Sequence, residues 1–226
     1  MELIPVDVVK LERNPSVGFC KRPTDMIDTI VIHHSETSPT TSPEQINDMH
    51  LNQQWYMAGY TFMVNSAYPN SSKPRLRATE GRPIEYVGAH AGTGVFVKMN
   101  ELQKKLWNEG KIICGTEEDK LVKDETLMQG DKIKANVTTI GLVVIGNYAP
   151  MSVRNPNGYG KLENRAPTLE TLDGVARLAC QIQKKYPLIK NIKWHSFYHS
   201  TDCPGDLKKY VPKIRDLTKK YGCEFY

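Results

Sequence analysis

The sequence predicts an α/β protein in which a mixed central β-sheet is flanked by helices on both faces. Buried β-branched runs such as Thr29–Ile32 alternate along the chain with segments that repeat apolar residues at helical spacing. Short hairpin-like stretches lie between them, which a purely parallel sheet would lack. With 226 residues, 39% of them apolar and 24% charged, and no internal repeats, the chain is most simply one large globular domain.

The first strand and the first helix have clear local signals. Thr29–Ile32 is the kind of run that forms a fully buried strand. His33 and His34 follow at its carboxyl end, which is where open α/β sheets bind ligands. Ser42 can cap a helix of about three turns, and Pro43 suits the first helical position.

The middle of the chain is less regular. Residues 60–65 predict a strand, and the turn-rich segment 68–74 connects it to a second short strand around 75–79, which together predict a hairpin. The segment 94–137 contains one short amphipathic helix but is otherwise polar and irregular. We therefore expect it to be an insertion.

Regular structure resumes with a buried strand at 138–148. Gly141 and Gly146 interrupt this strand, and we expect another group to approach the backbone closely there. The segment 166–186 is the clearest helix, with Thr168 as its cap.

A short strand at 191–195 precedes the last helix. Asp206 is expected to cap this helix. Pro212 would lie inside it, so we expect a kink or a shortened helix.

Charge and cysteine content exclude some classes of protein. The net charge of +5 comes from scattered lysine pairs, and basic and aromatic residues do not interleave, so no nucleic-acid partner is expected. No run is apolar enough for a membrane span, and the start of the chain lacks the pattern of a signal peptide, so synthesis in the cytoplasm is expected. Among the five cysteines, Cys180 lies in a helical pattern and is expected to be a buried free thiol.

Three residues can form a metal site. His33, His195 and Cys203 all lie at strand ends or at loop starts, which a sheet brings to one edge. Catalytic zinc takes three protein ligands and keeps one position open for water. Two alternatives stay open: a structural zinc site with His34 or His199 as fourth ligand, and a cysteine nucleophile with a nearby base.

Five sequence blocks carry a resemblance to a known family. In chain order they are "TIVIHHSET", "AGYTFMVN", "GRPIEYVGAHA", "TIGLVVIGNY" and "WHSFYHSTDCPGDL". This ordered set resembles the zinc-dependent N-acetylmuramoyl-L-alanine amidases, the family shared by phage amidase-type lysozymes and peptidoglycan recognition proteins. The resemblance implies an N-terminal extension at 1–27 and a catalytic domain at 28–226, with the insertion at about 94–137 near the substrate groove.

The resemblance also implies a role for each site residue. His33, His195 and Cys203 would hold one zinc ion per chain. Tyr60 and Thr201 would be catalytic and would stabilise the oxyanion. The proton acceptor is left open between Tyr60 and Glu36. The residues expected to bind substrate are His90, His34 and Asn147.

The implied activity is hydrolysis of the amide bond between N-acetylmuramic acid and L-alanine in peptidoglycan. Two alternatives accompany it: a peptidoglycan-binding module without catalysis, and an amidase that recycles soluble muropeptides. The presence of Cys203 favours catalysis, because non-catalytic members tend to replace that ligand. We expect a monomer whose partner is peptidoglycan and which acts at the cell wall or in the periplasm.

Overall fold

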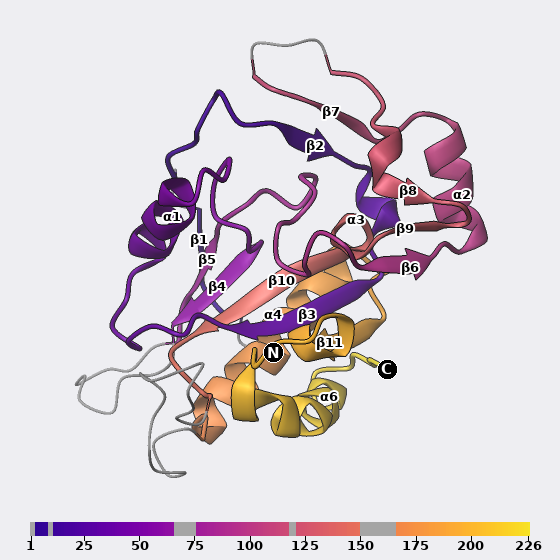
Figure 1. Cartoon of the computed structure of the whole chain (residues 1–226). Coiled ribbons are helices and arrows are strands. Elements are labelled where there is room, and N and C mark those ends of the chain that lie inside the picture. Colours follow the sequence, from indigo (N-terminus) through magenta and orange to yellow (C-terminus); the bar gives the residue numbers. More distant parts are fainter. Residues whose placement is uncertain (1–2, 9–10, 66–75, 118–120, 150–165) are drawn as a thin grey trace.

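The computed structural model describes residues 3–8, 11–65, 76–117, 121–149 and 166–226. Its centre is a six-stranded sheet in the order β1-β5-β4-β10-β3-β11 (Figure 1). The strands are β1 (Val6–Val8), β3 (Thr29–His34), β4 (Phe62–Asn65), β5 (Ala78–Glu80), β10 (Thr139–Ile145) and β11 (Asn191–Trp194). Neighbouring strands are parallel except β4 and β5, which pair antiparallel. The predicted mixed sheet is confirmed, and so is the hairpin pairing, although its turn at 68–74 lies outside the described residues.

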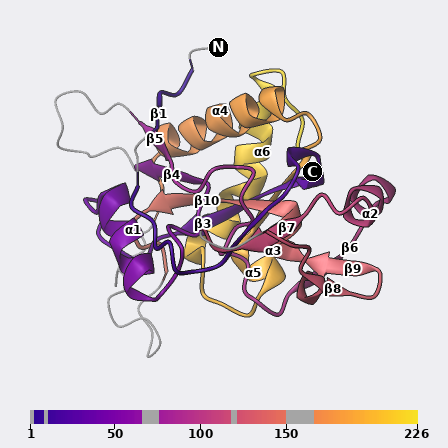
Figure 2. The ribbon, with the colours of Figure 1, turned by 90° about the horizontal axis from the view of Figure 1, so that it is seen from above.

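Helices cover both faces of this sheet. On one face α4 (Leu169–Lys185) and α6 (Val211–Lys219) pack side by side, as Figure 2 shows from above. On the other face α1 (Pro43–Asn52) contributes Ile46 to a second apolar cluster. Side chains of β10 alternate between the two clusters, since Leu142 belongs to the first and Val143 to the second. None of the described helices is long and apolar enough to cross a membrane.

The predicted starts of α1 and α4 are confirmed by their caps. The Ser42 side chain accepts a hydrogen bond from the backbone N–H of Gln45, whose own side chain accepts one from the Ser42 N–H. Thr168 accepts a hydrogen bond from the N–H of Thr171. These bonds use backbone donors that a helix start would otherwise leave unpaired.

The start predicted for the last helix is wrong. Asp206 lies within a 3₁₀ helix, η4 (Gly205–Tyr210), whose N-cap is Pro204, and its carboxylate pairs with Lys209 at 2.8 Å. The α-helix begins only at Val211, which places Pro212 in its first turn. A proline there loses no hydrogen bond, whereas a helix starting at Asp206 would contain it in its interior.

Residues 94–137 form a small lobe beside the central sheet. It contains the three-stranded sheet β6-β9-β8, with β6 (Phe96–Lys98), β9 (Lys132–Lys134) and β8 (Met128–Gln129), and the helices α2 (Glu101–Asn108), η2 (Glu125–Leu127) and α3 (Ala135–Thr138). An apolar cluster built around Trp107, Ile112 and Ile133 fills the lobe, and it also includes Met26 and Val87 from outside the lobe. The segment called irregular from its polarity is therefore largely ordered, apart from residues 118–120, which lie outside the described part. Its status as an insertion and the division at residue 28 stay predictions.

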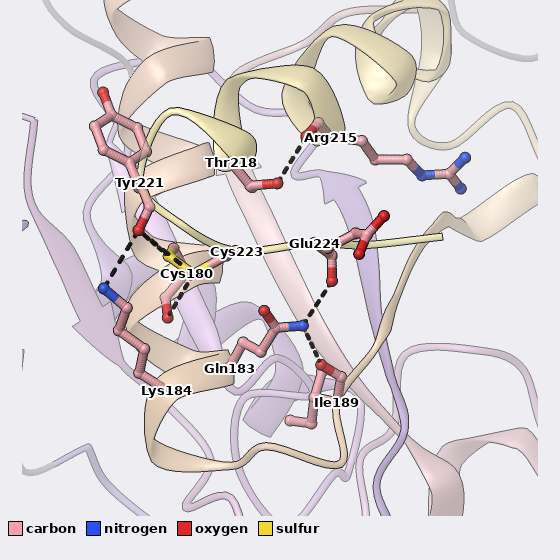
Figure 3. The surroundings of a disulfide bond; sticks show 9 residues. All are labelled: Cys180, Gln183, Lys184, Ile189, Arg215, Thr218, Tyr221, Cys223 and Glu224. Carbon is pink, nitrogen blue, oxygen red and sulfur yellow. Dashed lines mark hydrogen bonds between the residues drawn. A yellow bond between two sulfur atoms is a disulfide. The ribbon is translucent and has the colours of Figure 1, made fainter.

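Two disulfides connect distant parts of the chain. Cys20 in β2 (Phe19–Lys21) is bonded to Cys114 in β7 (Ile113–Gly115), which ties the lobe to the N-terminal segment. Cys180 in α4 is bonded to Cys223 after α6, so the expectation of a free thiol at Cys180 is wrong (Figure 3). A helix position that faces the core accepts a thiol or a disulfide equally well, and only the tertiary structure brings the partner near.

Around the second bridge, α4 also holds the C-terminal segment through hydrogen bonds. The Gln183 side-chain amide donates to the carbonyls of Ile189 and Glu224, each at 2.9 Å, and Lys184 donates to the carbonyl of Tyr221 (Figure 3). The C-terminal segment is therefore fixed to α4 by covalent and polar contacts together.

These pairings predict the thiol count. We expect one reactive thiol, that of Cys203, in chains denatured without reductant, and all five after reduction. Reduction should also lower the melting temperature, because such a bridge typically contributes about 2–4 kcal/mol by restricting the unfolded chain. Titration with a chromogenic thiol reagent measures the count, and Cys203→Ala, expected to show none before reduction, is the control. Three reactive thiols before reduction would show that a bridge is missing.

Candidate metal centre

Three donor side chains meet at the carboxyl edge of the sheet. His33 lies near the end of β3, and His195 follows β11 at the start of α5 (His195–Tyr198). The parallel register that pairs Trp194 with Ile32 brings the two histidines side by side, with ring centroids 4.5 Å apart. Cys203 approaches from the loop before η4. The ligand atoms of all three lie within 4.8 Å of one another.

The contacts of these donors fit a metal ion. The His33 Nδ1 faces the Cys203 Sγ at 3.5 Å. Both ring nitrogens of His195 are buried and have no hydrogen-bond partner among the described residues. Leaving buried polar atoms unpaired is unfavourable, and a metal bound by one of them would remove part of that cost. Two imidazoles and one thiol form a donor set that suits zinc.

Burial sets the protonation of the three donors. It lowers the pKa of His33 well below its usual value and that of His195 to about 4, so both rings are neutral near pH 7. Burial raises the pKa of the Cys203 thiol, which therefore keeps its proton until a metal displaces it. Neutral imidazoles can bind a metal directly, whereas metal binding at Cys203 releases a proton.

A chain of hydrogen bonds fixes the orientation of the His33 ring. The Thr139 hydroxyl lies 2.8 Å from the carbonyl of Ala135 and must donate to it. The same hydroxyl, 3.3 Å from the His90 Nε2, then accepts from that nitrogen. The His90 Nδ1 in turn accepts from the His33 Nε2 at 3.0 Å. The remaining nitrogen of His33, Nδ1, is thereby left with a free lone pair directed at Cys203.

The position of His90 depends on its neighbours. The Asn136 side chain accepts hydrogen bonds from the N–H groups of His90 and Ala91 and donates to the carbonyl of Gly92. Gly141 leaves room for the ring, because a Cβ there would lie 2.8 Å from the His90 Cγ. The close approach predicted at Gly141 is thus confirmed.

The two residues expected to be catalytic lie close to the centre. The half-buried Tyr60 has its ring centroid 5.1 Å from that of His33. Burial is the main cause that raises its pKa, with the Cys203 sulfur adding to the effect, so the phenol keeps its proton. The Thr201 hydroxyl accepts a hydrogen bond from the Cys203 N–H at 3.3 Å. Their catalytic roles stay predictions.

The predicted substrate-binding residues differ in how accessible their side chains are to a substrate. His90 lines a cavity as well as contacting His33. The His34 side chain is fully buried: its Nδ1 accepts from the N–H of Tyr148, and its Nε2 lies 3.3 Å from a Glu36 carboxylate oxygen. Asn147 is 4% exposed and accepts from the N–H of Ala149. A substrate contact by His34 or Asn147 would require movement of these loops, and all three roles stay predictions.

A cavity of about 560 Å³ opens beside the centre. His90, His195 and His199 line one part of it, and Trp55 lines another. Among the described residues, neither His34 nor His199 belongs to the cluster of donors. Three donors beside an open cavity fit a catalytic site better than a closed structural one.

Two residues of this site were not singled out from the sequence. Asn136 and Thr139 position His90, but both lie around the short helix α3, where the sequence has no strong helical pattern. The one available signal was Gly141, which indicated that some group approaches β10.

The mixed sheet with three possible metal donors at its carboxyl edge defines an α/β domain with a candidate metal site. The family model described as N-acetylmuramoyl-L-alanine amidase matches residues 22–206. The chain therefore belongs to the N-acetylmuramoyl-L-alanine amidase family. No curated protein matched the chain in sequence.

Solved structures share its fold at low sequence identity. The chain is similar to the endolysin N-acetylmuramoyl-L-alanine amidase LysCS from Clostridium intestinale, with 16% identity, a TM-score of 0.57 and 99% of each chain covered. It is also similar to the endolysin of the Thermus scotoductus bacteriophage Ph2119, with 14% identity, a TM-score of 0.50 and 92% of each chain covered. The bumblebee peptidoglycan recognition protein PGRP-SA matches with 15% identity and a TM-score of 0.54, covering 94% of this chain and 95% of that one.

The hydrogen-bond chain predicts that Thr139 affects metal affinity without touching the metal. We expect Thr139→Val to weaken zinc binding about ten- to a hundredfold, because the His90 ring loses the acceptor that fixes its orientation. Thr139→Ser keeps the hydroxyl and is the matched control. Competition with a metal-sensitive dye measures the affinity. Equal affinities of the two variants would contradict the proton order assigned to the chain.

Proposed function

We propose that this protein is a zinc-dependent amidase that hydrolyses the bond between N-acetylmuramic acid and L-alanine in peptidoglycan. The observation that carries the proposal is the cluster of His33, His195 and Cys203 beside an open cavity. Membership of the amidase family supports the same reaction. The fold likeness to endolysin amidases agrees with action on cell walls.

A recognition module without catalysis is the second candidate, because the chain also shares its fold with PGRP-SA. Cys203 favours the enzyme, since a binding module has no need of a buried thiol between two unprotonated imidazoles.

The proposed roles of the residues around the zinc follow from their protonation states. Zinc, when bound, lowers the pKa of a coordinated water and polarises the amide carbonyl. Tyr60 keeps its proton and acts as a hydrogen-bond donor to the oxygen that becomes negative in the transition state. Thr201, two residues before Cys203 in the same loop, would bind the same amide.

Glu36 is the proposed proton acceptor. Its pKa is lowered, first by the neighbouring His34, so the carboxylate is ionised near pH 7. His34 is itself fixed by the N–H of Tyr148, so it holds Glu36 in place. The backbone of Glu36 has a φ of 56°, a conformation that non-glycine residues rarely adopt and that is often found at functional sites.

The reaction is tested by its products. Purified peptidoglycan digested with the protein should release peptides that begin with L-alanine and leave the glycan strands intact, as identified by mass spectrometry. We expect about one zinc per chain. Cys203→Ala should lose both the metal and the products, because the remaining two donors bind zinc weakly, whereas Ser200→Ala in the same loop should keep both.

Two outcomes would oppose this proposal. Retention of peptidoglycan without cleavage by the zinc-loaded protein would indicate a recognition module. Products cut within the glycan or within the peptide would indicate another hydrolase.

The roles of Tyr60 and Glu36 can be separated from metal binding. Tyr60→Phe should lower kcat about a hundredfold by removing an oxyanion donor, and Glu36→Gln should lower it by a similar factor by removing the proton acceptor. Neither substitution should change the zinc content. The control Glu44→Gln, on the exposed first turn of α1, should leave both kcat and the zinc content unchanged. If Glu36→Gln had normal kcat, Glu36 would have no part in proton transfer.

A further inference from the structure

The cavity beside the metal centre is positively charged. Arg82 and Lys134 both line it, and among the described residues no aspartate or glutamate does. The two cations come from different parts of the chain, since Arg82 follows β5 and Lys134 ends β9 of the lobe. The cavity therefore lies between the central domain and the lobe.

Arg82 is a buried cation for which no carboxylate partner is found in the part of the chain that the structure describes. It is 4% exposed, and its guanidinium donates to the carbonyls of Met57, Ala58 and Val87 at 2.8–3.1 Å. These carbonyls satisfy three of its five N–H groups but do not neutralise its charge. Burial lowers its pKa to about 10, so the group remains charged near pH 7.

Lys134 supplies the second charge from the lobe. Its side chain is half-buried, and no ion pair with another described residue is found for it. Lys132, two residues earlier in the same strand, is exposed and does not line the cavity. The same strand thus carries one lysine at the cavity and one at the surface.

We propose that Arg82 and Lys134 form a subsite for a carboxylate of the stem peptide, so that the enzyme prefers acidic stems to amidated ones. This inference rests on the proposed function. His90 and His195 line the same cavity, so a peptide whose first amide lies at the metal centre extends along it. The stem residue after L-alanine carries either a free carboxylate or a carboxamide, and only the carboxylate offers the charge that a buried cation lacks.

The test compares two ligands that differ in that single group. They are N-acetylmuramoyl-L-alanyl-D-isoglutamate, with a free α-carboxylate, and its α-carboxamide. Binding is measured by calorimetry with full-length Cys203→Ala protein, which does not cleave them, and initial rates are measured with the zinc-loaded wild type. We expect the carboxylate ligand to bind about tenfold more tightly, with the preference decreasing as salt is added.

Variants of Lys134 and Lys132 test whether Lys134 causes the preference for the carboxylate ligand. In the same Cys203→Ala background, Lys134→Met should abolish the preference, Lys134→Arg should keep it, and Lys132→Met should keep it as the control with the same loss of charge. Melting temperatures verify that all variants are folded. Equal binding of the two ligands, binding of neither, or a preference unaffected by Lys134→Met would overturn the subsite.

The rates separate this proposal from the proposed function. Cleavage of both ligands without preference refutes the subsite and leaves the amidase standing. A preference in binding that depends on Lys134, with no cleavage by the wild type, supports the subsite and refutes the amidase.

Discussion

The hydrogen bond between His33 and His90 is the contact on which the rest of the site depends. His33 is buried at the end of β3, where a ring N–H without a partner would be costly. The His90 Nδ1 accepts this hydrogen bond. The His90 Nε2 then donates to the Thr139 hydroxyl, which donates to the carbonyl of Ala135. Because a carbonyl can only accept, the direction of every bond in the chain follows from its last member.

This contact explains several features around it. A side chain at residue 141 would overlap with the His90 ring, so this position requires glycine. Asn136 holds the backbone of the loop that carries His90. Arg22 donates to the carbonyls of Asn136, Val137 and Thr139. These bonds fix the segment that contains the Ala135 carbonyl and the Thr139 hydroxyl. The orientation of His33, a candidate metal ligand, thus depends on β3, β10 and α3 together.

Local signals explain which parts the sequence could predict. Ser42 and Thr168 fix helix starts through bonds within three residues, and a β-branched run defines β3 wherever it lies in the fold. The meeting of His33 and His195 was also predictable, because carboxyl ends of parallel strands share an edge. The pairing of His90 with Thr139 and of Cys180 with Cys223 depends on packing between segments 49 and 43 residues apart, which no local pattern encodes.

In the proposed subsite, the buried cations would connect the candidate metal centre with substrate choice. Burial and the neighbouring His195 lower the pKa of His90 to about 3, and the charges of Arg22 and Arg82 act in the same direction. His90 is therefore neutral, and its Nδ1 stays free to accept from His33. A carboxylate in that role would orient His33 as well but would be attracted to the same two arginines and would cancel their field. A neutral histidine adds no negative charge beside Arg82. In the proposed subsite, Arg82 at the cavity wall can then attract the carboxylate of a substrate.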